Sequence, residues 1–170
     1  MTSALNNVLN PRRLPLLMVA SAAAVLIAAN VFEHGFGYQP CQLCLYQRLP
    51  WWIALGIGCL AMIVLKKDRP TLSLLLMLVG FAAVAVGAGI AGYHAGVEYG
   101  FWEGPSGCTG ARELGGGLSE ALGQIQGGMV APSCDTAPWS LFGISMAGYN
   151  FLISLGLVAL GAWIMKRGII

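Results

Sequence analysis

Residues 41–65 read CQLCLYQRLPWWIALGIGCLAMIVL, and this stretch decides the fold. From Leu45 to Leu65 it is apolar over the length of about 20 residues that a helix needs to cross a bilayer. It begins with a Cys-x-x-Cys pair, Cys41 and Cys44, at the end where the apolar run meets the membrane surface. A sulfur pair that can form and break a disulfide therefore lies at a predicted membrane boundary.

The rest of the chain has the same membrane character. Of its 170 residues, 57% are hydrophobic and only 9% are charged, whereas about a quarter are charged in a soluble domain. Four apolar stretches are long enough to span a bilayer, at residues 14–32, 45–65, 71–93 and 148–165. We therefore predict an all-α membrane protein, a four-helix transmembrane bundle that forms a single membrane domain over residues 1–170.

The basic residues predict how this bundle is oriented. Seven of the nine Lys and Arg residues fall on one face of a four-span arrangement: Arg12, Arg13, Lys66, Lys67, Arg69, Lys166 and Arg167. Because Lys and Arg are enriched in cytoplasmic loops, that face and both termini are predicted to be cytoplasmic. The net charge of +2 then reports orientation and does not indicate a nucleic-acid partner. A cleaved signal peptide over the first span is the alternative, but its apolar run is longer than a usual signal core.

Two outer loops follow from this orientation, at residues 33–44 and 94–147, and the second is by far the longest connection. The first holds Cys41 and Cys44, and the second holds Cys108 and Cys134. In a bacterial-looking membrane protein this face is the oxidising periplasm, where disulfides persist. A long loop of this kind is usually functional.

Other features of the sequence concern packing. Near-helical spacing of apolar residues over 114–125 suggests a short helix on the membrane surface, or a loop patch packed on the bundle. Small residues at spacing four predict close helix contacts. They are Ala20, Ala24 and Ala28 in the first span, and Ala83, Gly87 and Ala91 in the third.

The Cys-x-x-Cys pair allows three interpretations. A zinc-binding membrane module would use Cys41, Cys44, Cys108 and Cys134, but the second two are far apart in sequence and form no second knuckle. A non-enzymatic membrane protein with structural disulfides is the second, although so small a ring stabilises little. The third, a redox pair, is favoured by Arg48, one helical turn beyond Cys44. Its permanent cation can hold a Cys44 thiolate and hydrogen-bond a carbonyl of an acceptor.

The second cysteine pair and one histidine add to this set. A disulfide between Cys108 and Cys134 would either staple the loop or be the pair that a soluble partner attacks. His94 ends the third span at the depth of Arg48. It is either a hydrogen-bond donor or proton-transfer group for a carbonyl-bearing ligand, or an interfacial histidine among headgroups. Glu98, one turn later, could pair with it.

The sequence Cys-Gln-Leu-Cys-Leu-Tyr-Gln-Arg at 41–48 resembles the signature of the bacterial disulfide bond formation protein B (DsbB) family. The four-span layout, the long second outer loop, Cys108 with Cys134, and a Tyr-His at the end of the third span are also similar. The match covers nearly the whole chain. The related vitamin K epoxide reductase family has its loop cysteines before the Cys-x-x-Cys, whereas here they follow it, which favours the DsbB family.

The resemblance implies an inner-membrane thiol–quinone oxidoreductase, an enzyme that generates protein disulfides. It would reoxidise a periplasmic DsbA-like protein of the thioredoxin fold and pass the electrons to the membrane quinone pool, ubiquinone or menaquinone. The residues implied as catalytic are Cys41, Cys44, Cys108 and Cys134, those implied to contact the quinone are Cys44, Arg48 and His94, and no metal ligand is implied.

Within that set the resemblance also implies individual roles. Cys44 would form the thiolate–quinone contact, and Cys108 would form the mixed disulfide with the partner. Arg48 would polarise the quinone, and His94 would lie near its other side. Glu98 stands where the family often has Gln, so its role as a quinone contact does not carry over.

Overall fold

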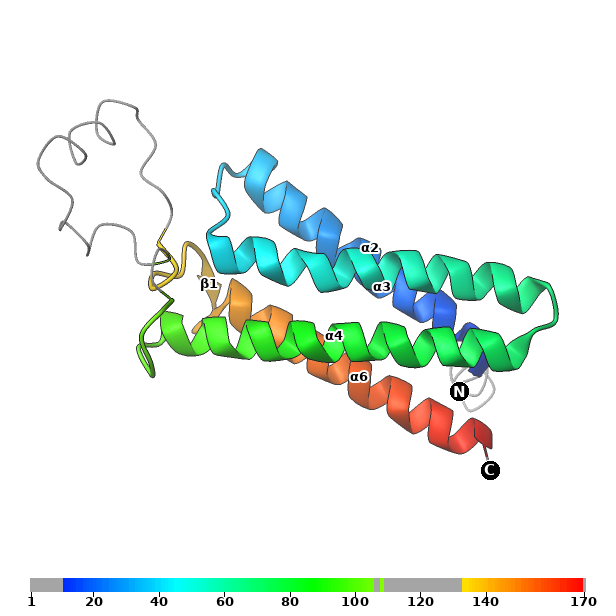
Figure 1. Cartoon of the computed structure of the whole chain (residues 1–170). Coiled ribbons are helices and arrows are strands. Elements are labelled where there is room, and N and C mark those ends of the chain that lie inside the picture. The colour runs from blue at the N-terminus through cyan, green and yellow to red at the C-terminus, as the bar shows by residue number, and fades with distance from the viewer. Residues whose placement is uncertain (1–10, 106–107, 109–132, 170) are drawn as a thin grey trace, which may run out of the picture.

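The computed structural model describes residues 11–105, 108 and 133–169. Four long helices lie side by side along the molecule (Figure 1). They are α2 (Leu14–Asn30), α3 (Gln42–Lys66), α4 (Pro70–Glu98) and α6 (Met146–Ile169). Each contains a stretch long and apolar enough to cross a membrane. The predicted four-helix transmembrane bundle is thus confirmed.

Short elements connect the long helices. A 3₁₀ turn, η1 (Pro11–Arg13), leads into α2, and a π-helical turn, η2 (Val31–Gly35), follows it. Strands β1 (Ser140–Leu141) and β2 (Ile144–Ser145) form an antiparallel hairpin just before α6. The surface helix suggested near residues 114–125 lies outside the described residues.

The hairpin is held against the end of α4 by one side chain. The Tyr99 hydroxyl donates to the Gly143 carbonyl at 3.0 Å and accepts from the Ser145 backbone N–H at 2.9 Å. Phe142 and Gly143 form the tight turn, with φ of 51° and 77°, the positive values that a two-residue hairpin turn of type I′ requires. This contact fixes where α6 begins, and so places the first turn of α6 next to α4.

Helix boundaries bring the cysteine pair into regular structure. Cys41 is the N-cap of α3, with an extended backbone, so Cys44 lies inside the first helical turn and not in a loop. Beyond the turn that follows α3, Pro70 is the first residue of α4, where no helical hydrogen bond needs its missing N–H. Helix α4 continues past residue 93 to Glu98, which makes His94 part of a helix.

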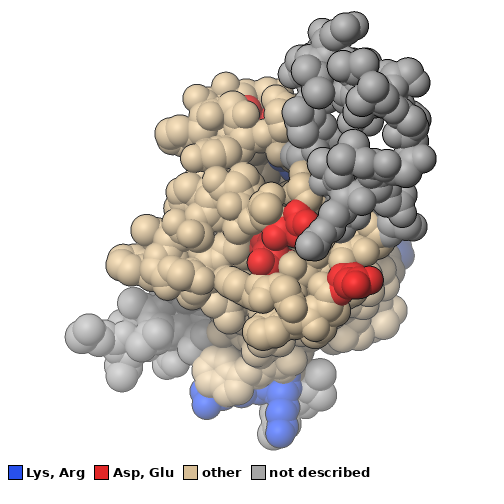
Figure 2. Space-filling model, turned by 90° about the vertical axis from the view of Figure 1, so that its left-hand side faces the viewer, with Lys and Arg blue, Asp and Glu red and all other residues tan. Residues whose placement is uncertain are grey.

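The two ends of the bundle differ in charge and chemistry. The starts of α2 and α4 and the ends of α3 and α6 share one end (Figure 1); it carries the seven basic residues from Arg12 to Arg167 named above, and we call it the basic end. We call the opposite end, with Cys41, Cys44, Cys108 and Cys134, the cysteine end. Figure 2 looks onto the cysteine end, where acidic side chains are visible on the near surface.

The packing face of α2 differs from the predicted one. Its buried residues include Met18, Ala22 and Leu26, whereas Ala20, Ala24 and Ala28 are exposed on the bundle surface. The stripe predicted for the first span is therefore wrong. Alanine is apolar enough to face lipid, so its spacing alone does not mark the packed face, and the larger side chains fill the space against the neighbouring helices.

The stripe predicted for the third span does pack. Gly87 and Ala91 are buried and Ala83 is half-buried. A Cβ at Gly87 would lie 3.0 Å from Cβ of Pro50, so α3 and α4 touch closely where the proline lies. Pro50 interrupts one helical hydrogen bond of α3 at this contact.

Two glycines of α3 provide a matched test of this packing. A Cβ at Gly58 would lie 2.8 Å from Cγ2 of Val19 on α2, whereas Gly56 has open space around that position. We expect Gly58→Ala to destabilise the bundle by about 1–3 kcal/mol through overpacking. Gly56→Ala is expected to leave stability unchanged or raise it by up to about 1 kcal/mol through helix propensity. Thermal unfolding in detergent checks this, and equal midpoints for the two variants would contradict the packing.

Candidate active site

Cys41 and Cys44 form a compact sulfur pair at the start of α3. Their Sγ atoms are 2.8 Å apart, and the Cys44 backbone N–H donates to Cys41 Sγ at 3.2 Å. Both are free cysteines, with Cys41 buried and Cys44 half-buried. The N-cap position directs the first N–H groups of the helix at the Cys41 sulfur, where they favour a negative charge.

These contacts lower the pKa of the Cys41 thiol from 9.0 to about 4. The largest cause is the hydrogen bond from the Cys44 side chain; burial opposes it, and His94 lowers the pKa further through a hydrogen bond and, when its ring is protonated, through its charge. The lowered pKa favours Cys41 as the thiolate of the reduced pair, whereas the sequence analysis expected a thiolate on Cys44 beside Arg48.

Arg48 lies one turn beyond Cys44, but its guanidinium turns toward the first outer loop. Nη1 donates to Glu33 Oε2 at 2.5 Å, and Nη2 donates to the Ala29 carbonyl at 3.5 Å. Neither of these hydrogen bonds goes to Cys44. Glu33, which the sequence analysis did not single out, is the residue that competes for the cation.

His94 is fully enclosed by protein. Its side chain is 2% exposed, which rules out the interpretation of a histidine among lipid headgroups. Nε2 lies 3.6 Å from Cys41 Sγ, and Nδ1 lies 2.7 Å from Nε2 of Gln47. Glu98 Oε1 is 3.8 Å from His94 Nε2, so the expected pairing with Glu98 is present.

Three further side chains extend this contact away from the sulfur. Asn150 Nδ2 donates to Gln47 Oε1 at 2.6 Å, and Trp51 Nε1 donates to Asn150 Oδ1 at 2.9 Å. The sequence analysis missed all three. A signal was there, since Gln47 and Asn150 are amides in apolar spans, where a polar side chain needs an internal partner.

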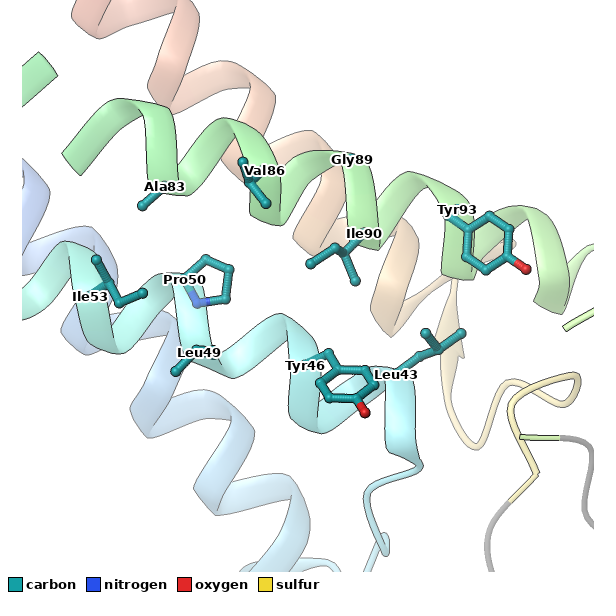
Figure 3. A pocket seen from close by; sticks show the side chains of 10 residues that line it. All are labelled: Leu43, Tyr46, Leu49, Pro50, Ile53, Ala83, Val86, Gly89, Ile90 and Tyr93. Atoms are coloured by element: carbon teal, nitrogen blue, oxygen red, sulfur yellow. The ribbon is translucent and has the colours of Figure 1, made fainter. Parts of the chain in front are cut away.

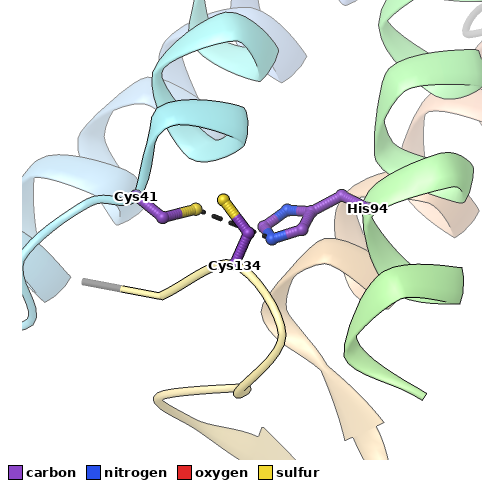
Figure 4. A group of neighbouring side chains, drawn as sticks. All are labelled: Cys41, His94 and Cys134. Carbon is purple, nitrogen blue, oxygen red and sulfur yellow. Dashed lines mark hydrogen bonds between the residues drawn. The ribbon is translucent and has the colours of Figure 1, made fainter. Parts of the chain in front are cut away.

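The second cysteine pair closes over the first. Cys108 and Cys134 form a disulfide, and both are buried. The Sγ atoms of Cys41 and Cys134 and a ring nitrogen of His94 lie within 4.8 Å of one another. Figure 4 shows the three side chains converging, from α3, α4 and the segment before the hairpin. The structure thus brings together the cysteines of both pairs and His94, while the hydrogen bonds of Arg48 go to Glu33 and Ala29.

Two sulfurs and an imidazole at this distance match a soft metal site in spacing. The donor atoms do not match in this state, because Cys134 Sγ is bonded to Cys108 and is no thiolate. With that disulfide closed, Cys108 and Cys134 are not available as the deprotonated thiols that zinc binds. The described residues have the arrangement of a thiol–disulfide exchange centre.

A cavity of about 320 Å³ opens beside Cys44, between the four long helices. Its polar lining residues include Cys44, Gln47, Arg48, His94, Glu98, Tyr149 and Asn150. Cys41 is not among the lining residues. Glu98 Oε2 is buried and has no hydrogen-bond partner among the described residues. Apolar walls with a few convergent polar groups are typical of a small-molecule site.

A second concavity lies on the lipid-facing side, between α3 and α4 (Figure 3). Its lining is apolar except for the Tyr46 and Tyr93 hydroxyls, and it includes Pro50 and Gly89. No sulfur, carboxylate or imidazole of the described residues lines it. This groove is therefore not the candidate active site.

The model of the family named disulfide bond formation protein DsbB matches residues 11–164, which contain every site residue described above. The chain belongs to the DsbB family. Membership and the four apolar helices make it a multi-pass membrane protein of disulfide bond formation, of an oxidoreductase family.

Individual relatives are similar over most of their length. Disulfide bond formation protein B of Polaromonas naphthalenivorans (strain CJ2) is 30% identical over 159 residues, 88% of this chain and 89% of its own. That of Verminephrobacter eiseniae (strain EF01-2) is 26% identical over 166 residues, 94% of this chain and 88% of its own. An uncharacterised protein of Rickettsia prowazekii (strain Madrid E) is 28% identical over 146 residues, 85% of this chain and 82% of its own.

Proposed function

We propose that this DsbB-family chain is a thiol–quinone oxidoreductase of the inner membrane. It reoxidises a periplasmic, DsbA-like protein of the thioredoxin fold and passes the electrons to a membrane quinone. The observation that carries the proposal is that the two sulfurs of one pair face different neighbours. Cys41 lies against the loop disulfide, whereas Cys44 lines the cavity. A pair placed between a disulfide and a ligand cavity can move two electrons from one to the other.

The first exchange takes place at the loop disulfide. A thiolate of the partner attacks Cys108 Sγ, the Cys108–Cys134 bond breaks, and Cys134 leaves as a thiolate. The spacing supports this order, because Cys134 is the sulfur of the pair that lies near Cys41 and can continue inward. The partner's second thiol then displaces Cys108, which leaves the partner with its disulfide and Cys108 with a free thiol.

The second exchange takes place at the start of α3. With Cys41 and Cys44 oxidised, the Cys134 thiolate attacks Cys41 Sγ, and Cys44 leaves as a thiolate facing the cavity. Cys108 then attacks Cys134 and displaces Cys41, which restores the loop disulfide. The products are a closed Cys108–Cys134 disulfide and a reduced Cys41–Cys44 pair, the combination seen in the structure.

The cavity residues fit a quinone head group. Its volume of about 320 Å³ is at the small end of ligand sites, and its walls are largely apolar. Arg48 and the amide hydrogens of Gln47 and Asn150 are donors for a carbonyl oxygen, beside the Cys44 sulfur. A bound quinone supplies a two-electron, two-proton acceptor that regenerates the Cys41–Cys44 disulfide.

The orientation proposed for the bundle follows the charges of its ends. The basic end faces the cytoplasm together with both termini, because Lys and Arg favour that side. The cysteine end then faces the periplasm, where a soluble dithiol partner and persistent disulfides are found.

Arg48 gives a test of the quinone site. We expect Arg48→Met to raise the KM for a soluble quinone analogue about tenfold to a hundredfold, because a charge-assisted hydrogen bond is worth roughly 1.5–3 kcal/mol. Glu33→Gln is the matched control: it removes the competing carboxylate and keeps the guanidinium, so the KM is expected to stay low or to fall. Steady-state quinone reduction with a reduced partner measures both. A wild-type KM in Arg48→Met would contradict the assignment of this cavity.

A further inference from the structure

Four side chains from three helices form a hydrogen-bonded chain that ends at the Cys41 sulfur. It runs from Trp51 on α3 to Asn150 on α6, back to Gln47 on α3, and then to His94 on α4. The successive donor–acceptor distances are 2.9, 2.6 and 2.7 Å, and His94 Nε2 completes the chain 3.6 Å from Cys41 Sγ. Trp51, Gln47 and His94 are each at most 5% exposed, and Asn150 is half-buried, so these hydrogen bonds have little competition from bulk water.

The donors in this hydrogen-bonded chain all point the same way, from Trp51 toward His94, and Trp51 sets this direction. An indole N–H can only donate, so Asn150 must present its oxygen to Trp51. The Asn150 amide then points its N–H at Gln47, which must accept through Oε1. Gln47 in turn donates from Nε2 to Nδ1 of His94, which must be the unprotonated nitrogen. Reversing either amide would set two buried donors against each other, an arrangement that folded proteins avoid.

We propose that Trp51, Asn150 and Gln47 are positioning residues that lock His94 in its neutral, Nε2-protonated form, with this N–H directed at Cys41. In the exchange proposed above, the Cys41–Cys134 bond breaks and Cys41 leaves as a thiolate. The His94 Nε2–H, directed at this sulfur, stabilises the negative charge as it develops. Both amides are neutral at every relevant pH, so the lock does not depend on an ionisable group of its own.

Among the described residues, one carboxylate competes as an acceptor and one hydroxyl is an accessory donor. Glu98 Oε1 lies 3.8 Å from His94 Nε2. The Ser154 hydroxyl donates to Asn150 Oδ1 at 3.5 Å. This second bond has the same direction as that of Trp51, so it supports the orientation of Asn150 without being needed to fix it.

The tautomer can be read directly because the chain has only two histidines. Protein labelled with ¹⁵N-histidine, free of quinone and partner and prepared with Cys41 and Cys44 reduced and the Cys108–Cys134 disulfide closed, gives one set of ring nitrogen signals for His94 and one for His34. His34 is exposed and serves as the internal reference. We expect His94 to show a protonated Nε2 and an unprotonated Nδ1 between pH 6 and 8. A His94 that is mainly Nδ1-protonated would overturn the proposal.

Asn150→Asp tests whether the chain sets this state. An aspartate still accepts from Trp51 but has no N–H for Gln47, so Gln47 must turn its amide and present its oxygen to His94. Nδ1 is then expected to gain a proton, giving either the Nδ1–H tautomer or the imidazolium. An unchanged His94 spectrum in a folded Asn150→Asp protein would overturn the proposal. Ser154→Ala is the control and should leave the signals as in the wild type.

Cys41 reports the consequence of the change. If Asn150→Asp yields the neutral Nδ1–H form, the donor to the sulfur is lost and the pH profile of Cys41 alkylation should shift upward, so that the rate measured below its midpoint falls about threefold to tenfold, the effect of one hydrogen bond. If it yields the imidazolium, the donor is retained and the rate should hold. A rate that does not follow the measured ring state would count against the link to Cys41. Quinone and partner are absent from both measurements, so the state of the His94 ring is tested independently of the proposed function. Only the role of its N–H in the exchange rests on that function.

Discussion

Cys44→Ser is expected to abolish quinone-dependent oxidation of partner thiols, with a fall in rate on the order of a thousandfold or more. Cys44 is the sulfur that lines the cavity. Without it the Cys41 sulfur cannot form the internal disulfide, and no sulfur faces the acceptor. The bundle should remain folded, because serine replaces a half-buried thiol at the first turn of α3 and keeps a hydroxyl that can donate to Cys41.

Cys59→Ser is the matched control for this variant. It makes the same chemical change on the same helix, but Cys59 is an exposed free cysteine away from the sulfur centre. Turnover with a reduced partner and thermal unfolding in detergent should both match the wild type. Partner oxidation at the normal rate in Cys44→Ser would remove Cys44 from the electron path.

Cys134→Ser is expected to stop partner oxidation while it leaves the inner pair competent. The partner then has no disulfide to attack in the loop, so its oxidation should fall on the order of a thousandfold. A small dithiol that reduces Cys41 and Cys44 directly should still drive quinone reduction, within about tenfold of the wild-type rate. The ratio of the two rates in one preparation is the measurement.

The dithiol-driven rate also checks that Cys134→Ser is folded. Loss of a disulfide that closes a long loop costs typically about 2–4 kcal/mol, so a lower unfolding midpoint is expected. Loss of both activities together would point to a damaged bundle or to a single, undivided sulfur site. Continued partner oxidation would show that the loop disulfide is not on the route.

The large features of the fold were predictable because they follow from composition. Four apolar stretches and the clustering of basic residues specify a bundle without reference to any contact. The packed face of α2 was not predictable in the same way. In lipid both faces of a span are apolar, so Ala20 and Ala22 look alike in the sequence, and only the shape of the neighbouring helices decides which is buried.

Some residues of the candidate site were predictable from the sequence and others were not, for a similar reason. Cys41, Cys44 and His94 were predicted because thiols and a histidine at a membrane boundary are chemically conspicuous. The chain through Gln47 and Asn150 joins residues about a hundred positions apart, on helices whose relative rotation no local pattern specifies. The pKa of Cys41 is lowered chiefly by the hydrogen bond from the Cys44 side chain and also by His94, and the contact with His94 depends on how α3 and α4 pack.

The central claim is that electrons pass from the loop cysteines through Cys41 and Cys44 to a quinone. It is tested most directly by mixing fully reduced protein with a short-chain ubiquinone under anaerobic conditions and measuring the quinone consumed per chain. Each dithiol is a two-electron donor, so the wild type should consume about two equivalents, Cys108→Ser/Cys134→Ser about one, and Cys44→Ser none. Consumption of quinone by Cys44→Ser at the wild-type rate, or none by the wild type, would contradict the account.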